Sequence, residues 1–250
     1  MNMPMDTGTE AGASARIARL ISPQGASARD PLALLRLFHL VSPALPVGAY
    51  AYSQGLEYAT HAGWVRDEAS TLAWLEGLAT FGLGTLDLPI LKRLHAAWSA
   101  EDAGAVRHWN AQLLAARETS ELRAEELHLG RALARVLVEL ELAEAGRWQQ
   151  QSPVYATMFS LAAVRWHIEP VDALRGYLWS WCENQVLAAV KLVPLGQSAG
   201  QRVLHRLTEG LPAIIDRAQH LEAGDIGVGT ISQALASAWH ESQYTRLFRS

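Results

Sequence analysis

The sequence has little cysteine and no long apolar run, and each shortage excludes a class of protein. Cys182 is the only cysteine among 250 residues, which excludes an internal disulfide framework and a cysteine-based zinc cluster and fits a reducing compartment. We interpret Cys182 as a small buried hydrophobe. The longest uncharged stretches, such as Gly77 to Leu86, are shorter than the ~20 apolar residues that span a bilayer. The segment before Asp30 lacks a signal-peptide core, so we expect a cytoplasmic protein that enters no membrane.

Charge is also scarce. Charged residues make up 18% of the chain, below the usual figure of about 25%, so part of the surface should be apolar and covered by a partner. The net charge of −4 and the pI near 6.1 give no general attraction for nucleic acid or anionic lipid. Since half of the residues are hydrophobic, we expect a sizeable core and protein partners.

The spacing of apolar residues from Asp30 onward is helical, with no sustained alternation of strand type. It predicts an all-α fold: one domain, a bundle of about nine or ten helices. We expect a flexible N-terminal tail over 1–29, the helical domain over 30–240 and a C-terminal partner-binding tail over 241–250. The expected helices are about 31–41, 49–63, 68–98 with a kink or break at Pro89, 101–116, 120–140, a helix from 153, 172–192, 198–221 and 226–239.

Four residues have the character of helix N-caps: Asp30, Asp67, Thr119 and Asp172. Several carboxyl groups crowd the first turns of the helix that follows Thr119. Carboxylates suit the positive end of a helix dipole. We therefore interpret these residues as a solvated helix start rather than as catalytic carboxylates; they are Glu121, Glu125 and Glu126.

The residues that could carry chemistry are dispersed. The nine histidines lack the spacing of a zincin site, so we predict no metal site of the protein's own, although a transient site shared with a partner stays open. His39, His95 and His167 are expected to be structural. No phosphate loop occurs, and Ser53 is not in a nucleophile elbow. We predict no catalytic residue and no cofactor; the alternatives are a small all-helical hydrolase that uses Ser53 or a histidine, and a metallochaperone.

The segment "LPVGAYAYSQGLE", Leu45 to Glu57, combines turn formers with aromatic and polar residues. Gly48 should mark a turn before a helix that starts near Tyr50, and the Tyr50 hydroxyl would then reach a partner. Ser53 and Gln54 are expected to form local hydrogen bonds.

The segment "VPLGQSAGQR", Val193 to Arg202, places helix breakers before amide side chains. Gln197 and Gln201 bury poorly unless they are hydrogen-bonded. The segment therefore either organises a polar network or faces another chain.

The final segment, "HESQYTRLFRS", places Tyr244, Leu247 and Phe248 on one apolar face at helical spacing, with Arg246 and Arg249 elsewhere. Chain ends are usually polar and frayed. Two interpretations stay open: a final turn docked on the domain, or an amphipathic anchor that becomes ordered only on a partner.

Together with "RETSELR", Arg117 to Arg123, these three segments resemble, in order and spacing, the urease accessory protein F family. The resemblance extends from about Asp30 to the last residue. It implies an all-α, cytoplasmic homodimer without catalysis of its own. Such a protein joins urease accessory protein D (also called H), and the pair recruits the nickel-carrying GTPase, accessory protein G, so that nickel reaches apo-urease.

The resemblance also implies roles for single residues. Tyr50 and Arg246 match positions used to recruit the GTPase, whose hydrolysis of GTP the complex would influence. The tail would become ordered against the D-type partner. The implied partner-binding residues are Tyr50, Tyr244, Arg246, Leu247, Phe248 and Arg249.

Overall fold

The computed structural model describes residues 30–227 and 229–250, and all regular structure in these residues is helical. The prediction of an all-α bundle with nine or ten helices is confirmed, whereas the predicted flexible tail over 1–29 lies outside the described residues. The ten α-helices in this part of the chain are α2 (Pro31–Leu40), α3 (Leu56–His61), α4 (Glu68–Gly77), α5 (Asp87–Ser99), α6 (Ala103–Ala115), α7 (Ser120–Glu139), α8 (Tyr155–Arg165), α9 (Pro170–Leu192), α10 (Gln197–His220) and α11 (Ile231–His240). Shorter segments are the 3₁₀ turns η1 (Ala49–Ala51), η3 (Ala143–Trp148) and η4 (Ala223–Asp225) and the π-helical turn η2 (Leu78–Leu83).

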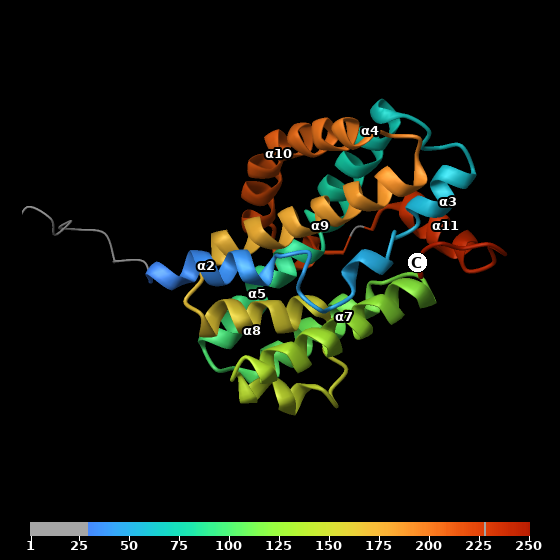
Figure 1. Cartoon of the computed structure of the whole chain (residues 1–250). Helices are drawn as coiled ribbons and strands as arrows, with labels where there is room; N and C mark the ends of the chain where they lie inside the picture. The colour runs from blue at the N-terminus through green and yellow to red at the C-terminus, as the bar shows by residue number, and fades with distance from the viewer. Residues whose placement is uncertain (1–29, 228) are drawn as a thin grey trace, which may run out of the picture. The chain divides into compact units, whose positions relative to one another are not determined.

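Residues 32–250 form one compact unit, with α5 and α8 at its centre. Ile90 and Leu91 of α5 and Phe159 of α8 are each 0% exposed. In Figure 1, α7 and α8 lie below α9, while α4 and α10 lie above it. The core is therefore shared by helices from every part of the described chain, and the single-domain prediction is confirmed. None of the helices in the described ranges is long and apolar enough to cross a membrane.

Local signals set several helix ends as predicted. Asp67 caps α4 through a bond of 2.8 Å from the backbone N–H of Ser70 to its carboxylate, and Thr119 accepts the N–H of Leu122 at 3.2 Å at the start of α7. The predicted N-cap at Asp172 is wrong. Helix α9 begins two residues earlier at Pro170, because proline is favoured in the first turn, where no N–H is required.

Two expected helices are shorter than the sequence suggested. The expected helix over 49–63 is interrupted after η1, because Gly55 adopts a left-handed conformation with φ of +85° before α3. A Cβ at Gly55 would also lie 3.1 Å from the backbone nitrogen of Ser237, so only glycine allows α11 to approach this closely. The helix expected from Ile226 begins instead at Ile231. The helix expected over 68–98 is divided, but not at Pro89: α4 ends at Gly77 and α5 begins at Asp87, so Pro89 lies in the first turn of α5.

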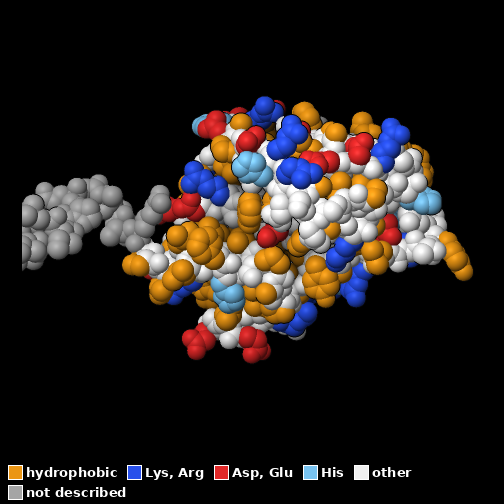
Figure 2. All heavy atoms as spheres, turned by 45° about the horizontal axis from the view of Figure 1, so that its top comes forward, with side chains coloured by type: hydrophobic (Ala, Val, Ile, Leu, Met, Phe, Trp, Pro, Cys, Tyr) orange, Lys and Arg blue, Asp and Glu red, His pale blue; other side chains and the backbone are white. Residues whose placement is uncertain are grey.

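The surface carries exposed apolar side chains, as the low charge predicted. Leu34, Leu35 and Phe38 of α2 are 58%, 60% and 58% exposed. Figure 2 shows hydrophobic side chains gathered over α2 on this face of the molecule. On α11, Ile231 and Leu235 are 78% and 44% exposed.

Candidate functional site

The C-terminal residues are docked on the domain, but not as a helix. Phe248 is 6% exposed, whereas Leu247 and Tyr244 are 67% and 102% exposed. The helical spacing read from the sequence is wrong, because residues 241–250 contain no helix. Phe248 packs in a small apolar cluster, and the Nζ of Lys191 lies 5.7 Å from the centre of its ring.

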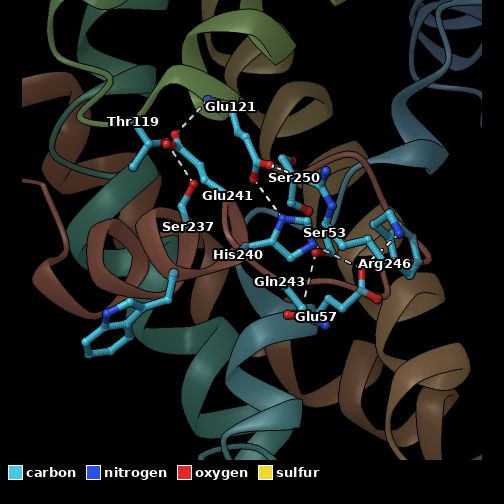
Figure 3. Close-up of polar contacts among 12 residues, drawn as sticks. Ser53, Glu57, Thr119, Glu121, Ser237, His240, Glu241, Gln243, Arg246 and Ser250 are labelled. Atoms are coloured by element: carbon cyan, nitrogen blue, oxygen red, sulfur yellow. Dashed lines mark hydrogen bonds and ion pairs between the residues drawn. The ribbon is translucent and has the colours of Figure 1, made fainter.

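A carboxylate on α3 holds the backbone of this segment. Glu57 accepts the N–H of Leu247 at 2.6 Å and the N–H of Phe248 at 2.8 Å. The same carboxylate lies 3.2 Å from Nε2 of His240, whose side chain is fully buried, and Nδ1 of His240 lies 2.7 Å from Glu121. Figure 3 shows His240 between these two carboxylates, so one side chain joins α3, α7 and α11.

Three further side chains hold the last residues. The free oxygen of Glu121 accepts from NH1 of Arg246 at 2.8 Å. The backbone N–H of Ser53 donates to the carbonyl of Ser250 at 2.9 Å, and the Ser53 hydroxyl donates to the same oxygen. The hydroxyl of Ser250 donates to Glu125 at 2.8 Å. We call Ser53, Glu57, Glu121, Glu125 and His240, with residues 245–250, the tail dock.

The polar residues after Tyr52 form more distant bonds than the sequence predicted. Ser53 does form the expected local bond, since it accepts the N–H of Glu57 at 3.2 Å, but its hydroxyl also donates to Ser250 at the other end of the chain. Gln54 donates to Glu125 at 2.7 Å and accepts from the indole N–H of Trp181 at 2.8 Å. The expected solvated start of α7 is also wrong, since Glu125 and Glu126 are 5% and 7% exposed.

The start of α7 is buried because α11 and the tail cover it. The hydroxyl of Thr119 lies 2.7 Å from that of Ser237, and Glu241 accepts the N–H of Ser120 at 2.9 Å. Glu241 thus satisfies an N–H that the helix itself leaves without a partner. The dipole argument correctly placed acids at this helix end, but tertiary contacts decided their exposure.

A second buried polar group lies on the inner side of α7. The guanidinium of Arg117 donates to Glu126 at 3.0 Å and to Asp87 of α5 at 3.2 Å. Burial alone would lower the pKa of Arg117, but the two carboxylates outweigh it and hold this pKa well above its ordinary value. Burial raises the pKa of Tyr155 and of Tyr177, so both hydroxyl groups keep their protons. We call these five residues the Arg117 centre.

The residues expected to bind partners fall into two groups. The side chains of Tyr50 on η1, Tyr244 and Leu247 are exposed, by 66%, 102% and 67%, so they are accessible to a partner. The backbone N–H of Arg249 donates to the carbonyl of Ala51 at 2.9 Å, so η1 and the tail lie against each other. Phe248, by contrast, faces the domain, and Arg246 is paired with an acid of α7.

The amides of "VPLGQSAGQR" do not form an internal network. Gln197 and Gln201 are both exposed at the start of α10. Gly200, between them, is buried, and a Cβ there would lie 2.5 Å from the side chain of Val190. The small residues of this segment therefore allow α10 to pack on α9, while its amides stay on the surface.

The residues that could have carried catalysis are buried and have structural contacts. Ser53 is 0% exposed, and its hydroxyl donates to a carbonyl rather than to a base, so the geometry does not support the alternative of a Ser53 hydrolase. His95 is buried and bonded to the carbonyl of Ile168 at 3.1 Å, and burial lowers its pKa. Cys182 is buried as expected, with its thiol pKa raised by burial to about 12. Residues 30–227 and 229–250 contain no group of three or more His, Cys, Asp or Glu that could hold a metal.

The fold and the site define a class: a single all-α domain whose buried polar groups hold chain segments in place and whose surface exposes apolar side chains. The family model UreF matches residues 65–208. Three proteins named urease accessory protein UreF are similar over most of the chain. The one from Alkalilimnicola ehrlichii is 50% identical, over 88% of this chain and 96% of its own. Those from Teredinibacter turnerae and Chromohalobacter salexigens are 49% and 47% identical, over 87% and 92% of this chain and 98% and 100% of theirs. The chain belongs to the UreF family of urease accessory proteins, which confirms the resemblance seen in the sequence.

Proposed function

We propose that this protein is an assembly factor, without catalysis of its own, for the insertion of nickel into apo-urease. It acts in the cytoplasm as a homodimer and bridges the D-type (or H-type) accessory protein and the nickel-carrying G-type GTPase. The names of the relatives support the role in urease maturation. Nickel is the cargo of this complex rather than a cofactor of this chain.

One observation carries the bridging role: two segments almost two hundred residues apart lie against each other and expose aromatic or apolar side chains. Tyr50 lies on one of these segments, and Tyr244 and Leu247 lie on the other. Tyrosine and arginine are residue types that carry much of the energy of protein interfaces. The tail would contact the D-type partner, and Tyr50 and Arg246 would recruit the GTPase, whose GTP hydrolysis is then biased by differential contacts.

The first experiment tests the tail. The protein is co-expressed with the D-type and G-type partners, with and without residues 241–250, and we measure partner pull-down and urease maturation. We expect the truncated protein to lose the D-type partner and active urease. Capture of the D-type partner and normal maturation by the truncated protein would contradict the role of the tail.

The second experiment concerns Arg246, which is 41% exposed at its side chain and paired with Glu121. Arg246→Ala should spare folding and D-type binding but reduce recruitment of the GTPase. The control is Arg135→Ala, which removes an exposed arginine of α7 and should leave both partners bound. If Arg246→Ala loses both partners equally, Arg246 acts only by docking the tail; if it loses neither, it has no part in recruitment.

A further inference from the structure

A cavity of about 70 Å³ lies between η1, α5, α7, α8 and α9. At roughly 10–15 Å³ for each water, this volume accommodates about five waters, or an organic ion of a few heavy atoms. Its lining includes Ala49, Gln54, Asp87, Glu125, Tyr155 and Gln185. The cavity therefore joins the Arg117 centre to the tail dock.

The charges that line this cavity are not balanced. It is lined by three carboxyl groups, those of Asp87, Glu125 and Glu126, and by one cation, Arg117. Arg117 is bonded to Asp87 and Glu126, and Glu125 forms no ion pair with any residue that the structure describes, although the charge of Arg117 acts on it. The hydrogen bonds to Glu125 come from neutral donors, the amide of Gln54 at 2.7 Å and the hydroxyl of Ser250 at 2.8 Å.

An amide on the opposite helix lacks a donor. Gln185 of α9 lines the cavity and is 2% exposed, and its Oε1 accepts no hydrogen bond from any described residue. A buried acceptor without a donor destabilises the folded state. The indole N–H of Trp181 cannot serve, because it already donates to Gln54. Gln185 thus marks a place for a molecule that donates a hydrogen bond.

We propose that this cavity binds a small cation that carries N–H donors, of the ammonium or guanidinium class. Such an ion supplies the positive charge that Glu125 lacks and the N–H that Gln185 lacks. A cation without N–H groups could supply the charge for Glu125 but not the hydrogen bond for Gln185. This site is independent of the bridging role proposed above, since it requires no partner.

The position of Glu125 also links the cavity to the tail. One of its oxygens accepts from Gln54 and the other from Ser250. A bound cation favours the ionised carboxyl, and hydrogen bonds to an ionised acceptor are roughly twice as strong as neutral ones. Occupation of the cavity should therefore tighten the docking of the tail.

Binding should depend on pH through Glu125. Burial raises the pKa of Glu125 to about 7, against the lowering effect of the bonds from Gln54 and Ser250. Protonation of this carboxyl on the acid side of that value removes the charge that attracts the ion. The other titratable or charged groups around it are Tyr52 before α3, Asp87 on α5, Arg117 before α7, Glu126 and His128 on α7, Tyr155 on α8, Tyr177 on α9 and Arg249 on the tail.

The test is isothermal titration of the full chain with methylammonium chloride, and with tetramethylammonium chloride at the same ionic strength. Methylammonium should bind saturably, and its Kd should rise about tenfold from about pH 8 to about pH 6, as expected for a carboxyl with a pKa near 7. Tetramethylammonium should not bind. The absence of saturable methylammonium binding, or equal binding of both ions, would overturn the proposal without any variant.

Three variants locate the site. Gln185→Leu should weaken methylammonium binding at least tenfold, and Glu125→Gln should abolish both the binding and its pH dependence. Glu139→Gln, which removes an exposed carboxylate from the same helix, should bind like the parent. Circular dichroism checks that each variant folds. Unchanged binding in folded Gln185→Leu and Glu125→Gln proteins would show that any bound ion lies elsewhere, which contradicts the assignment.

Discussion

Glu125 and Glu126 are neighbours on α7, buried to nearly the same extent, yet their surroundings differ. Glu126 belongs to the Arg117 centre and shares a guanidinium with Asp87. Glu125 belongs to the tail dock and receives bonds from neutral groups. Burial raises the pKa of Glu125 to about 7, whereas Glu126 forms an ion pair with Arg117. The two carboxyl groups therefore differ in their partners rather than in their depth.

The two regions also differ in what they connect. The Arg117 centre joins α5, α7, α8 and α9 inside the domain. The tail dock joins the last residues to α3, α7 and α11. Loss of the first should therefore unfold the domain, whereas loss of the second should release a segment from a folded domain.

The largest effect is expected from Arg117→Met, which leaves Asp87 and Glu126 buried without their cation. Removal of one partner from a buried ion pair typically costs about 3–5 kcal/mol. Urea unfolding followed by circular dichroism measures this loss. Arg135→Met, an exposed change on α7, should cost less than about 0.5 kcal/mol. A loss below about 1 kcal/mol for Arg117→Met would mean that water replaces the guanidinium without difficulty.

A smaller effect is expected from Glu125→Gln, and it depends on pH. The pKa of Glu125 is raised from 4.5 to about 7 in the folded protein. The folded state then binds the extra proton between these values, so this group's stabilising contribution is present at low pH and is lost as pH rises through about 7. At 1.36 kcal/mol for each pKa unit, the advantage of the parent over Glu125→Gln should shrink by about 2 kcal/mol from about pH 5 to about pH 7.5.

Urea unfolding at the two pH values checks this second prediction, with Glu139→Gln as the control. That variant should follow the parent at both pH values, because its carboxylate is exposed. Parallel pH profiles for the parent and Glu125→Gln would show that Glu125 has an ordinary titration. The contrast between the two neighbouring carboxyl groups of α7 would then be wrong.

The sequence predicted those features that depend on near neighbours. Asp67 and Thr119 cap helices through bonds to residues three positions away, so a short segment contains the whole signal. Pro170 also carried such a signal, but the sequence reading placed the cap at Asp172 instead. The four motifs identified the family because their order and spacing are preserved along the chain.

The site itself depends on distant partners, and that is why its chemistry was not predicted. An acid in the first turns of a helix has the same local pattern whether water or another segment covers it, so the sequence predicts a solvated Glu125. Ser53 bonds to Ser250, and Glu57 bonds to the backbone of Leu247, across most of the chain. The sequence does contain polar residues inside otherwise apolar segments. This pattern indicates a buried hydrogen-bond network, but it does not show which residues are bonded to each other.

The smallest effect on global stability should come from the tail, and two adjacent residues provide the comparison. Phe248 is 6% exposed and Leu247 is 67% exposed. Truncation of a core phenylalanine costs about 3–5 kcal/mol, but a segment that can undock alone limits the loss, so we expect about 1–2 kcal/mol for Phe248→Ala. Leu247→Ala should cost less than about 0.5 kcal/mol.

Native-state hydrogen exchange measures the undocking of the tail directly. The amide N–H of residue 248 donates to Glu57, and it should exchange at least about tenfold faster in Phe248→Ala than in Leu247→Ala. If Phe248→Ala instead destabilised the whole domain as much as Arg117→Met, the tail would unfold only with the core, and the two regions would be one cooperative unit.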